Sequence, residues 1–229
     1  MLKLKFFVII YLSLIEEVIF LIKKIIVFSL IILSLTFASC SDSDTSLNTG
    51  KMENKNYINN WMDIKIEQPD GWEIIPDEEL IELYSNQDNV VVGLGDSKKK
   101  QFENGSFSGL YPMGFVHTAT NANLLIVIEK SEADPNEAIN SYINNLRTQI
   151  QKLESQGLYY TLQDSKDATI GGFSCTQIEA LAEYSGNKIT QNYYLKPKDG
   201  YIFALITTSP SDDGSAAINE LLDNIKTVQ

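Results

Sequence analysis

The chain has very little cysteine and histidine, the residues that build thiol nucleophiles and transition-metal centres. Its 229 residues include two cysteines, Cys40 and Cys175, and a single histidine, His117. This set cannot supply the nitrogen and sulfur ligands that zinc sites use. A cysteine–histidine dyad would need Cys175 and His117 within hydrogen-bond distance. Because Cys175 falls in an expected strand, we interpret it as a small buried apolar residue, and we expect no catalytic residue, cofactor or metal.

Positive charge is scarce as well. The chain carries 18 Lys and Arg against 30 Asp and Glu, a net charge of −12. Setting aside the four lysines and two glutamates before Cys40 leaves 14 basic and 28 acidic residues, a formal charge of −14. Such a surface repels polyanions, so nucleic acid and anionic lipid headgroups are disfavoured as partners. The basic run Lys98-Lys99-Lys100 is expected in a solvated loop, with docking of an acidic partner as the alternative.

Carboxylates are plentiful, so calcium is the ion hardest to exclude. Two helix starts could gather them, namely Asp77, Glu78, Glu79 and Glu82 at one and Asp212-Asp213 at the other. Acidic side chains at a helix N-terminus also oppose the helix dipole favourably without any metal. Since the spacing matches no EF-hand loop, we favour the electrostatic interpretation.

A glycine-containing turn follows the apolar run Val90–Val92. Gly93-Leu94-Gly95-Asp96 resembles part of a nucleotide-binding turn but lacks its third glycine. Residues 96–109 are expected to form a polar loop, whereas a nucleotide-binding turn opens a helix. We therefore interpret this segment as the turn that ends a strand.

The longest apolar stretch ends just before Cys40. Lys23-Lys24 precede the run Ile25–Leu35, and Phe37-Ala38-Ser39 lead into Cys40. This order resembles a bacterial lipoprotein signal, in which cleavage before a cysteine is accompanied by its acylation. The apolar stretch is shorter than the ~20 residues that a membrane-spanning helix needs. We therefore predict that Cys40 carries the lipid, such as palmitate, and anchors the chain to the extracytoplasmic side of a bacterial membrane.

A second apolar run, Phe6–Ile15, lies further upstream and is followed by Glu16-Glu17. A signal peptide rarely carries two carboxylates ahead of its basic region. One explanation is a start site assigned too far upstream, with initiation near residue 21 or 22. The alternative is a two-segment membrane hairpin, which would bury both glutamates in the bilayer at high cost. We expect residues 1–39 to form the signal segment, and we attribute 1–20 to the upstream start.

Beyond this segment the sequence predicts a tether and one folded domain. Residues 40–56 are polar and without period, and a flexible segment of ~15 residues spans on the order of 20 Å. The remaining chain, 57–229, is long enough for one domain with a sizeable core. Its patterns predict strands near 61–67, 90–92, 124–128, 158–163, 173–184, 188–196 and 201–208, and helices near 77–84, 134–157 and 215–227.

Tight-turn signals at Gly171-Gly172, at 185–187 and at Asp199-Gly200 join the last strands. Strands joined in this way form an antiparallel meander. The helix at 134–157 is the best defined, since Asp134-Pro135-Asn136-Glu137 supplies its cap. The expected fold class is therefore α+β, an antiparallel sheet flanked by helices.

This element order resembles that of the PsbP-like α/β/α sandwich family. The local pattern behind the resemblance is Tyr57…Trp61-x-Asp63-Ile64-x-Ile66-x-x-Pro69-x-Gly71-Trp72. The family includes the photosystem II protein PsbP, Ran-binding Mog-type factors, DcrB and many bacterial lipoproteins. The resemblance covers about 57–229 and implies binding or assembly roles without catalysis. It carries over no catalytic residue, and binding surfaces do not transfer with a fold.

The predicted function is that of a lipid-anchored, extracytoplasmic envelope lipoprotein without enzymatic activity, which binds or helps to assemble another envelope protein. The alternative is a lipoprotein that binds a small ligand or a cation such as calcium, between the sheet and the 96–115 loop. An enzyme using Cys175 and His117 comes third. Tyrosines concentrate in the meander, and outward-facing ones would suit a partner surface, although core packing explains them equally well.

Overall fold

The computed structural model describes residues 47–84, 90–135, 137–154, 159–184 and 187–228. A nine-stranded sheet has the order β4-β6-β7-β12-β11-β10-β8, with β5 beside β6 and β9 beside β10, and a four-stranded sheet has the order β1-β2-β3-β13. The strands of the large sheet are β4 (Trp72–Ile74), β5 (Val90–Val92), β6 (Gly109–His117), β7 (Asn123–Lys130), β8 (Tyr159–Leu162), β9 (Lys166–Ile170), β10 (Phe173–Tyr184), β11 (Asn187–Lys198) and β12 (Tyr201–Ser209). The small sheet comprises β1 (Lys51–Glu53), β2 (Asn56–Asn59), β3 (Ile64–Glu67) and β13 (Ile225–Lys226).

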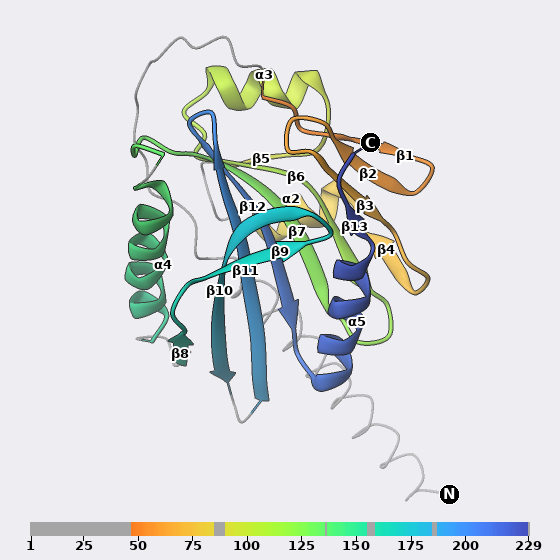
Figure 1. Ribbon diagram of the computed structural model, residues 1–229, viewed down its shortest axis with the longest axis vertical. Helices are drawn as coiled ribbons and strands as arrows, with labels where there is room; N and C mark the ends of the chain where they lie inside the picture. Colours follow the sequence, from red (N-terminus) through yellow and green to blue (C-terminus); the bar gives the residue numbers. More distant parts are fainter. Residues whose placement is uncertain (1–46, 85–89, 136, 155–158, 185–186, 229) are drawn as a thin grey trace, which may run out of the picture.

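Four helices accompany the sheets in the described part of the chain: α2 (Asp77–Tyr84), α3 (Asp96–Asn104), α4 (Ala138–Glu154) and α5 (Asp212–Asp223). Helices α4 and α5 lie on opposite sides of the large sheet (Figure 1). This arrangement is the predicted α+β class, with the antiparallel meander β10–β11–β12 between β7 and the edge strand β8 in the large sheet. The predicted bounds of β10 are confirmed, and those of β11 and β12 lie within two residues.

The large sheet is buried on both faces. Along β12, Phe203 and Leu205 pack in a core with α5 and the small sheet, which we call the α5-side core. Ala204 and Ile206 point the other way into a core with α4 and α2, the α4-side core. A strand covered on both faces has no polar side, and this explains the continuous apolar runs of β12 and β7.

The segment expected to be a polar loop contains helix α3. The N–H groups of Lys98 and Lys99 donate to Gly95 O at 3.1 and 3.0 Å, so the helix begins directly after the glycine turn. Phe102 is its one fully buried side chain. A helix held by a single apolar residue shows no apolar stripe, so periodicity could not reveal it. The lysine run 98–100 is therefore helical.

The fold begins before the expected boundary at residue 57. Leu47 and Thr49 are buried, and the hairpin of β1 and β2 occupies part of the segment assigned to the tether. Tyr57 Oη donates to Thr49 O at 2.9 Å, and Asn59 Nδ2 donates to Asn48 O at 2.9 Å. Polar side chains thus hold this segment in place, and only 41–46 remain between Cys40 and the fold.

The chain also ends differently from the prediction. Helix α5 stops at Asp223 and does not continue to 227, because Asn224 caps it. Ile225 and Lys226 then pair with Ile66 and Lys65 of β3. Ile225, which falls within the helix expected at 215–227, is instead a buried strand residue.

Further differences concern strands, since the C-terminal part of the segment expected as the 96–115 loop belongs to the mostly buried strand β6. Trp61 and Met62, expected in a strand, form a turn before β3. In this turn the Trp61 indole N–H donates to Asp199 Oδ2 at 2.9 Å, and its ring lies edge-on to Tyr201 with centroids 5.9 Å apart. These contacts fasten the small sheet to the β11–β12 hairpin. Strand β9 was not predicted, because four of its five residues are not buried and it lacks an apolar face.

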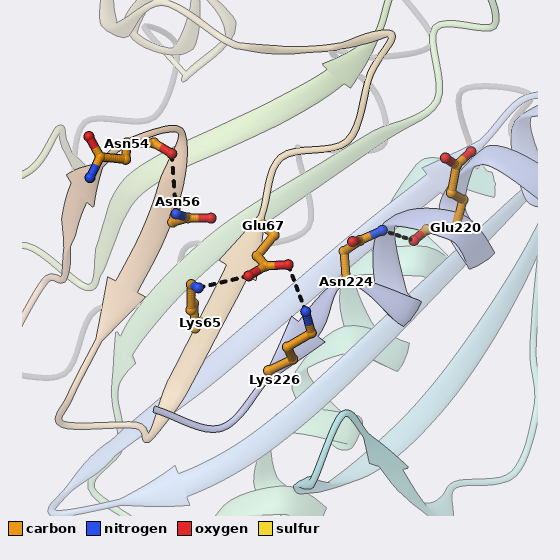
Figure 2. A network of polar contacts seen from close by, with 7 residues as sticks. All are labelled: Asn54, Asn56, Lys65, Glu67, Glu220, Asn224 and Lys226. Atoms are coloured by element: carbon orange, nitrogen blue, oxygen red, sulfur yellow. Dashed lines mark hydrogen bonds and ion pairs between the residues drawn. The ribbon is translucent and has the colours of Figure 1, made fainter. Parts of the chain in front are cut away.

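Three charged side chains join the terminal strand to its neighbour (Figure 2). Lys65 Nζ and Lys226 Nζ each lie 2.7 Å from one carboxylate oxygen of Glu67. The hydrogen bonds from Lys226 and then Lys65 lower the pKa of Glu67 from 4.5 to about 2. The ionised carboxylate therefore stabilises the pairing of β3 with β13.

The first stability prediction concerns Gly171, in the turn between β9 and β10. A Cβ at Gly171 would lie 1.7 Å from Ile225 O, whereas a Cβ at Gly200 meets nothing within 4 Å. Both glycines have positive φ, of +55° and +79°, so alanine costs backbone strain of roughly 1–2 kcal/mol at either. Gly171→Ala should lower the free energy of unfolding by roughly 3 kcal/mol or more, since Ile225 must also move. Urea denaturation of the two variants checks this, and equal losses would contradict it.

The second prediction concerns Glu67 and pH. The pKa of Glu67 is lower in the folded chain than in the unfolded chain. Its contribution to the free energy of unfolding is therefore complete above about pH 4.5 and is lost as the pH falls through about 2. Glu67→Gln should therefore be less stable than the wild type near neutral pH, and the difference should shrink in acid. Glu220→Gln is the matched control, since only the backbone oxygen of Glu220 takes part in the contacts of Figure 2. A pH-independent difference in urea denaturation would refute the assignment.

Candidate functional site

An open groove of about 390 Å³ lies between the start of α5 and the ends of β8, β10 and β11. Tyr159, Thr161, Leu181 and Glu183 line it from the sheet, and Ser211 and Ser215 line it from α5. The β10–β11 hairpin extends past the start of α5 at this end of the molecule (Figure 1). The helix therefore leaves this corner of the sheet uncovered.

Strand register explains which side chains face the groove. Leu181 pairs with Thr161 on β8 and with Thr190 on β11, and Glu183 pairs with Tyr159 and Lys188. Side chains alternate along a strand, and Ile178 and Ala180 of β10 fill the α4-side core. Leu181 and Glu183 consequently point to the opposite face, where the groove lies.

Two large apolar side chains are exposed at the groove. Tyr159 is 66% exposed and Leu181 is 40% exposed, on adjacent strands and diagonal to each other. Diagonal residues of neighbouring strands lie within reach of one aromatic side chain. Burying both would remove apolar area from water, which makes this the patch of the groove that a partner would cover.

The α5 wall is rich in hydroxyl groups that bond to one another. Gly214 N donates to Ser211 Oγ at 3.1 Å and thereby caps the helix. Ser209 Oγ donates to Ser211 O at 2.6 Å, and Ser215 Oγ donates to Ser209 Oγ at 2.9 Å. Asp212 and Asp213 occupy the first turn. These carboxylates balance the helix dipole, so this wall is a negative and mostly satisfied surface.

The structure does not bring Cys175 and His117 together. They lie on β10 and β6, four strand steps apart in the large sheet, which corresponds to about 19 Å across the strands. His117 Nδ1 is hydrogen-bonded to Thr120 Oγ1 at 2.9 Å, and its ring lies against Trp72 with centroids 5.3 Å apart. The third-ranked hypothesis, a dyad of these residues, is therefore wrong on geometric grounds.

Cys175 itself is half-buried, with its thiol directed to the Ala168 carbonyl at 3.6 Å. Burial raises the pKa of the thiol to about 11, although the Lys196 ammonium acts in the opposite direction. A reactive cysteine needs a depressed pKa, so this environment disfavours the thiolate.

The carboxylates at the helix starts do not form an ion site. Among the described residues, no group of three or more His, Cys, Asp or Glu side chains is arranged to hold a metal ion. The glycine turn before α3 is likewise unsuited to phosphate. A Cβ on Gly93 would lie 2.7 Å from Asp77 Oδ2, so a carboxylate already occupies the space beside the turn and would repel a second anion.

The tyrosines of the meander are divided between core and surface. Tyr193 and Tyr194 are buried, in the α4-side and the α5-side core respectively. Tyr201 packs against Trp61 and Phe102. The described tyrosine that faces outward at the groove is Tyr159, on the edge strand β8. The alternation of Leu181 and Glu183 with buried neighbours is the sequence signal that could have located this groove.

Comparisons with known proteins gave fold similarities only. No family model and no curated protein matches the chain. One similar structure is that of LpqN, a protein involved in cell envelope biogenesis of Mycobacterium tuberculosis. The similarity covers 72% of this chain and 83% of that chain, with 15% identity and a TM-score of 0.40. Cyanobacterial PsbP from Synechocystis is similar over 82% of this chain and 98% of that chain, with 10% identity and a TM-score of 0.42. A PsbP protein is thus among the similar structures, as the element order predicted.

A third structure, of a protein from Bacteroides thetaiotaomicron, is similar over 78% of this chain and 50% of that chain, with 14% identity and a TM-score of 0.40. Within the described ranges, none of the helices combines the length and the apolar character needed to cross a membrane.

The chemistry of Cys175 can be tested by alkylation. With a pKa of about 11, its thiolate fraction at pH 8 is roughly 100-fold smaller than that of a thiol with the usual value of 9. Iodoacetamide should therefore modify Cys175 slowly at pH 8, and the rate should still rise beyond pH 10. Mass spectrometry of the peptide that contains Cys175 measures this, with glutathione as the reference thiol. A rate that levels off near pH 8 would show an activated cysteine.

Proposed function

We propose that this protein is a lipid-anchored, non-catalytic protein of the bacterial cell envelope that binds an extended segment of another envelope protein. The observation that carries the proposal is the exposure of Tyr159 and Leu181 beside each other in the groove. The scarcity of cysteine and histidine in the sequence and the separation of Cys175 from His117 agree with a binding role.

An extended peptide fits the edge of the sheet at this site. Strand β8 has four residues and pairs with β10 on one side, at the border of the nine-stranded sheet. A peptide that adds to such an edge gains main-chain hydrogen bonds, and alternate side chains then reach the same face of the sheet. One row of its side chains would contact Tyr159 and Leu181, while Glu183 and Lys188 offer one charge of each sign.

A small-ligand site is the second candidate. The groove volume of about 390 Å³ falls within the range of about 300–1,000 Å³ typical of such sites. Small-molecule sites are usually enclosed and mostly apolar, whereas this groove is open and has a wall of hydroxyls and carboxylates. These properties favour a peptide over a metabolite.

The lipid anchor belongs to the proposal on sequence grounds. Cys40 lies outside the described residues, and the support for its acylation is the order of basic, apolar and small residues before it. The fold adds a consequence: because Leu47 is already buried in it, the expected anchor and this buried residue are seven positions apart. The bound partner would therefore have to reach the domain close to a membrane.

Site-specific crosslinking in the producing bacterium tests the groove. A photoreactive residue at Tyr159 should form a covalent adduct with a defined peptide of an envelope protein, and the same residue at Ile81, exposed on α2, is the matched control. The crosslinked peptide can then be synthesised, and Leu181→Asp should weaken its binding to the domain at least tenfold, a loss of about 1.4 kcal/mol in binding free energy. Its free energy of unfolding should change little, because Leu181 is substantially exposed.

The outcomes separate the candidates. Absence of a Tyr159 adduct, or equal adducts at Tyr159 and Ile81, would overturn peptide binding at the groove. Thermal stabilisation by a metabolite that is abolished in Leu181→Asp would instead support the small-ligand alternative.

A further inference from the structure

The chain enters its fold beside α3, the helix that carries the lysine run 98–100. The N–H of Gly95 donates to Thr49 Oγ1 at 3.1 Å, and Gly95 is the N-cap residue of α3. Figure 1 shows the first described residues, in orange, next to α3 and the β1–β2 hairpin. We call this end of the molecule, formed by α3 and the β1–β2 hairpin, the entry end. The β10–β11 hairpin and the groove lie at the opposite end (Figure 1).

The distance from a lipid on Cys40 to the entry end is limited by the chain. Seven residue steps separate Cys40 from Leu47. They span at most about 25 Å when fully extended and about 15 Å on average when flexible. Strand β10, with 12 residues, is about 40 Å long. A domain held at Leu47 can therefore bring its groove end to the bilayer only by lying on its side.

The entry end differs in charge from the rest of the domain. Its basic residues are Lys51, Lys55, Lys98, Lys99 and Lys100, and its acidic residues are Glu53, Asp96 and Glu103. Five against three gives a net charge of +2, within a portion of the chain whose formal charge is −14. Two ion pairs, Lys51–Glu53 and Lys99–Glu103, are internal to this set, so the surplus resides mainly on the remaining lysines.

The groove end has the opposite sign. Asp212, Asp213 and Glu183 lie there with Lys188 as the basic residue among the groove-lining side chains. An anionic bilayer attracts the entry end and repels the groove end. The overall negative charge, which disfavours binding of the free domain to such a bilayer, thus helps to orient a domain that the anchor already holds there.

We propose that α3 and the β1–β2 hairpin form a docking face for anionic lipid headgroups, which holds the anchored domain upright with the groove directed away from the bilayer. The proposal rests on the lipid anchor of the proposed function. Attraction between a basic residue and an anionic surface is weak, at about fivefold per lysine. It suffices here because the anchor confines the lysines to within a few tens of ångströms of the headgroups, which makes docking intramolecular.

The test uses the lipidated full chain in vesicles of phosphatidylcholine, with or without phosphatidylglycerol. An amine-acylating reagent and mass spectrometry give the reaction rate of each lysine. Acylation of Lys100 and Lys55, both exposed, should be several-fold slower in vesicles with phosphatidylglycerol, and that of Lys188 should be unchanged. About 1 M salt should remove the difference, because it shortens the screening length to about 3 Å.

Two variants sharpen the test. Replacing all three lysines of α3, as K98Q, K99Q and K100Q, should abolish the protection of Lys55 by phosphatidylglycerol. The matched control, Lys188→Gln at the groove end, should preserve it. Circular dichroism of the triple variant confirms that it is folded, and Phe102, which holds α3 in the core, is unchanged in it.

The outcomes distinguish this proposal from the one on which it rests. If the wild-type chain does not float with either kind of vesicle, and so behaves like the Cys40→Ser variant, both the lipid anchor and the docking face are refuted. A chain that floats with both vesicles but shows equal Lys100 and Lys55 rates overturns the docking face alone. If phosphatidylglycerol slows the acylation of Lys188 as well as that of Lys100 and Lys55, the domain lies on its side, and this result also overturns the docking face.

Discussion

Burial of β7 and β12 on both faces is the constraint on which the remaining structure depends. These central strands send alternate side chains into the α5-side and α4-side cores, so each face of the large sheet must be covered. One face requires α4 and α2, and the other requires α5 and the small sheet. The covering layers are shorter than the longest strands, β10 and β11. The end of these strands consequently remains uncovered and becomes the groove.

The parts of this arrangement that repeat along the sequence could be predicted. Strands β10, β11 and β12 follow from alternation and turn signals, and α4 follows from its cap and apolar stripe. Helix α3 could not be predicted in this way, because one residue, Phe102, fixes it to the core. The pairing of Ile225 with Ile66 joins the two ends of the fold, and local patterns do not encode such distant contacts. The groove depends on where α5 begins relative to the end of β10, which is likewise a property of the tertiary structure.

Polar contacts decide where the fold begins. Residues 47–56 have the composition of a linker, yet Tyr57 and Asn59 bind their backbone carbonyls and a hairpin forms. Hydrogen bonds to buried polar side chains order such a segment without an apolar pattern, because a buried hydroxyl or amide needs a partner. The same contacts place residues 47–56, which the sequence assigned to the tether, within the folded part of the chain.

The short distance along the chain between Cys40 and Leu47 changes the expected effect of the negative charge of the domain. With a long tether, a formal charge of −14 would only keep the domain away from anionic headgroups. If Cys40 carries the proposed lipid, seven residue steps to Leu47 keep the domain at the surface, and the distribution of its charge then matters more than the sum. The surplus of lysines lies where the chain enters the fold, and carboxylates lie at the groove. In the proposed arrangement, orientation and partner access would have one physical cause, because the forces that direct α3 toward the bilayer would also direct Tyr159 and Leu181 away from it.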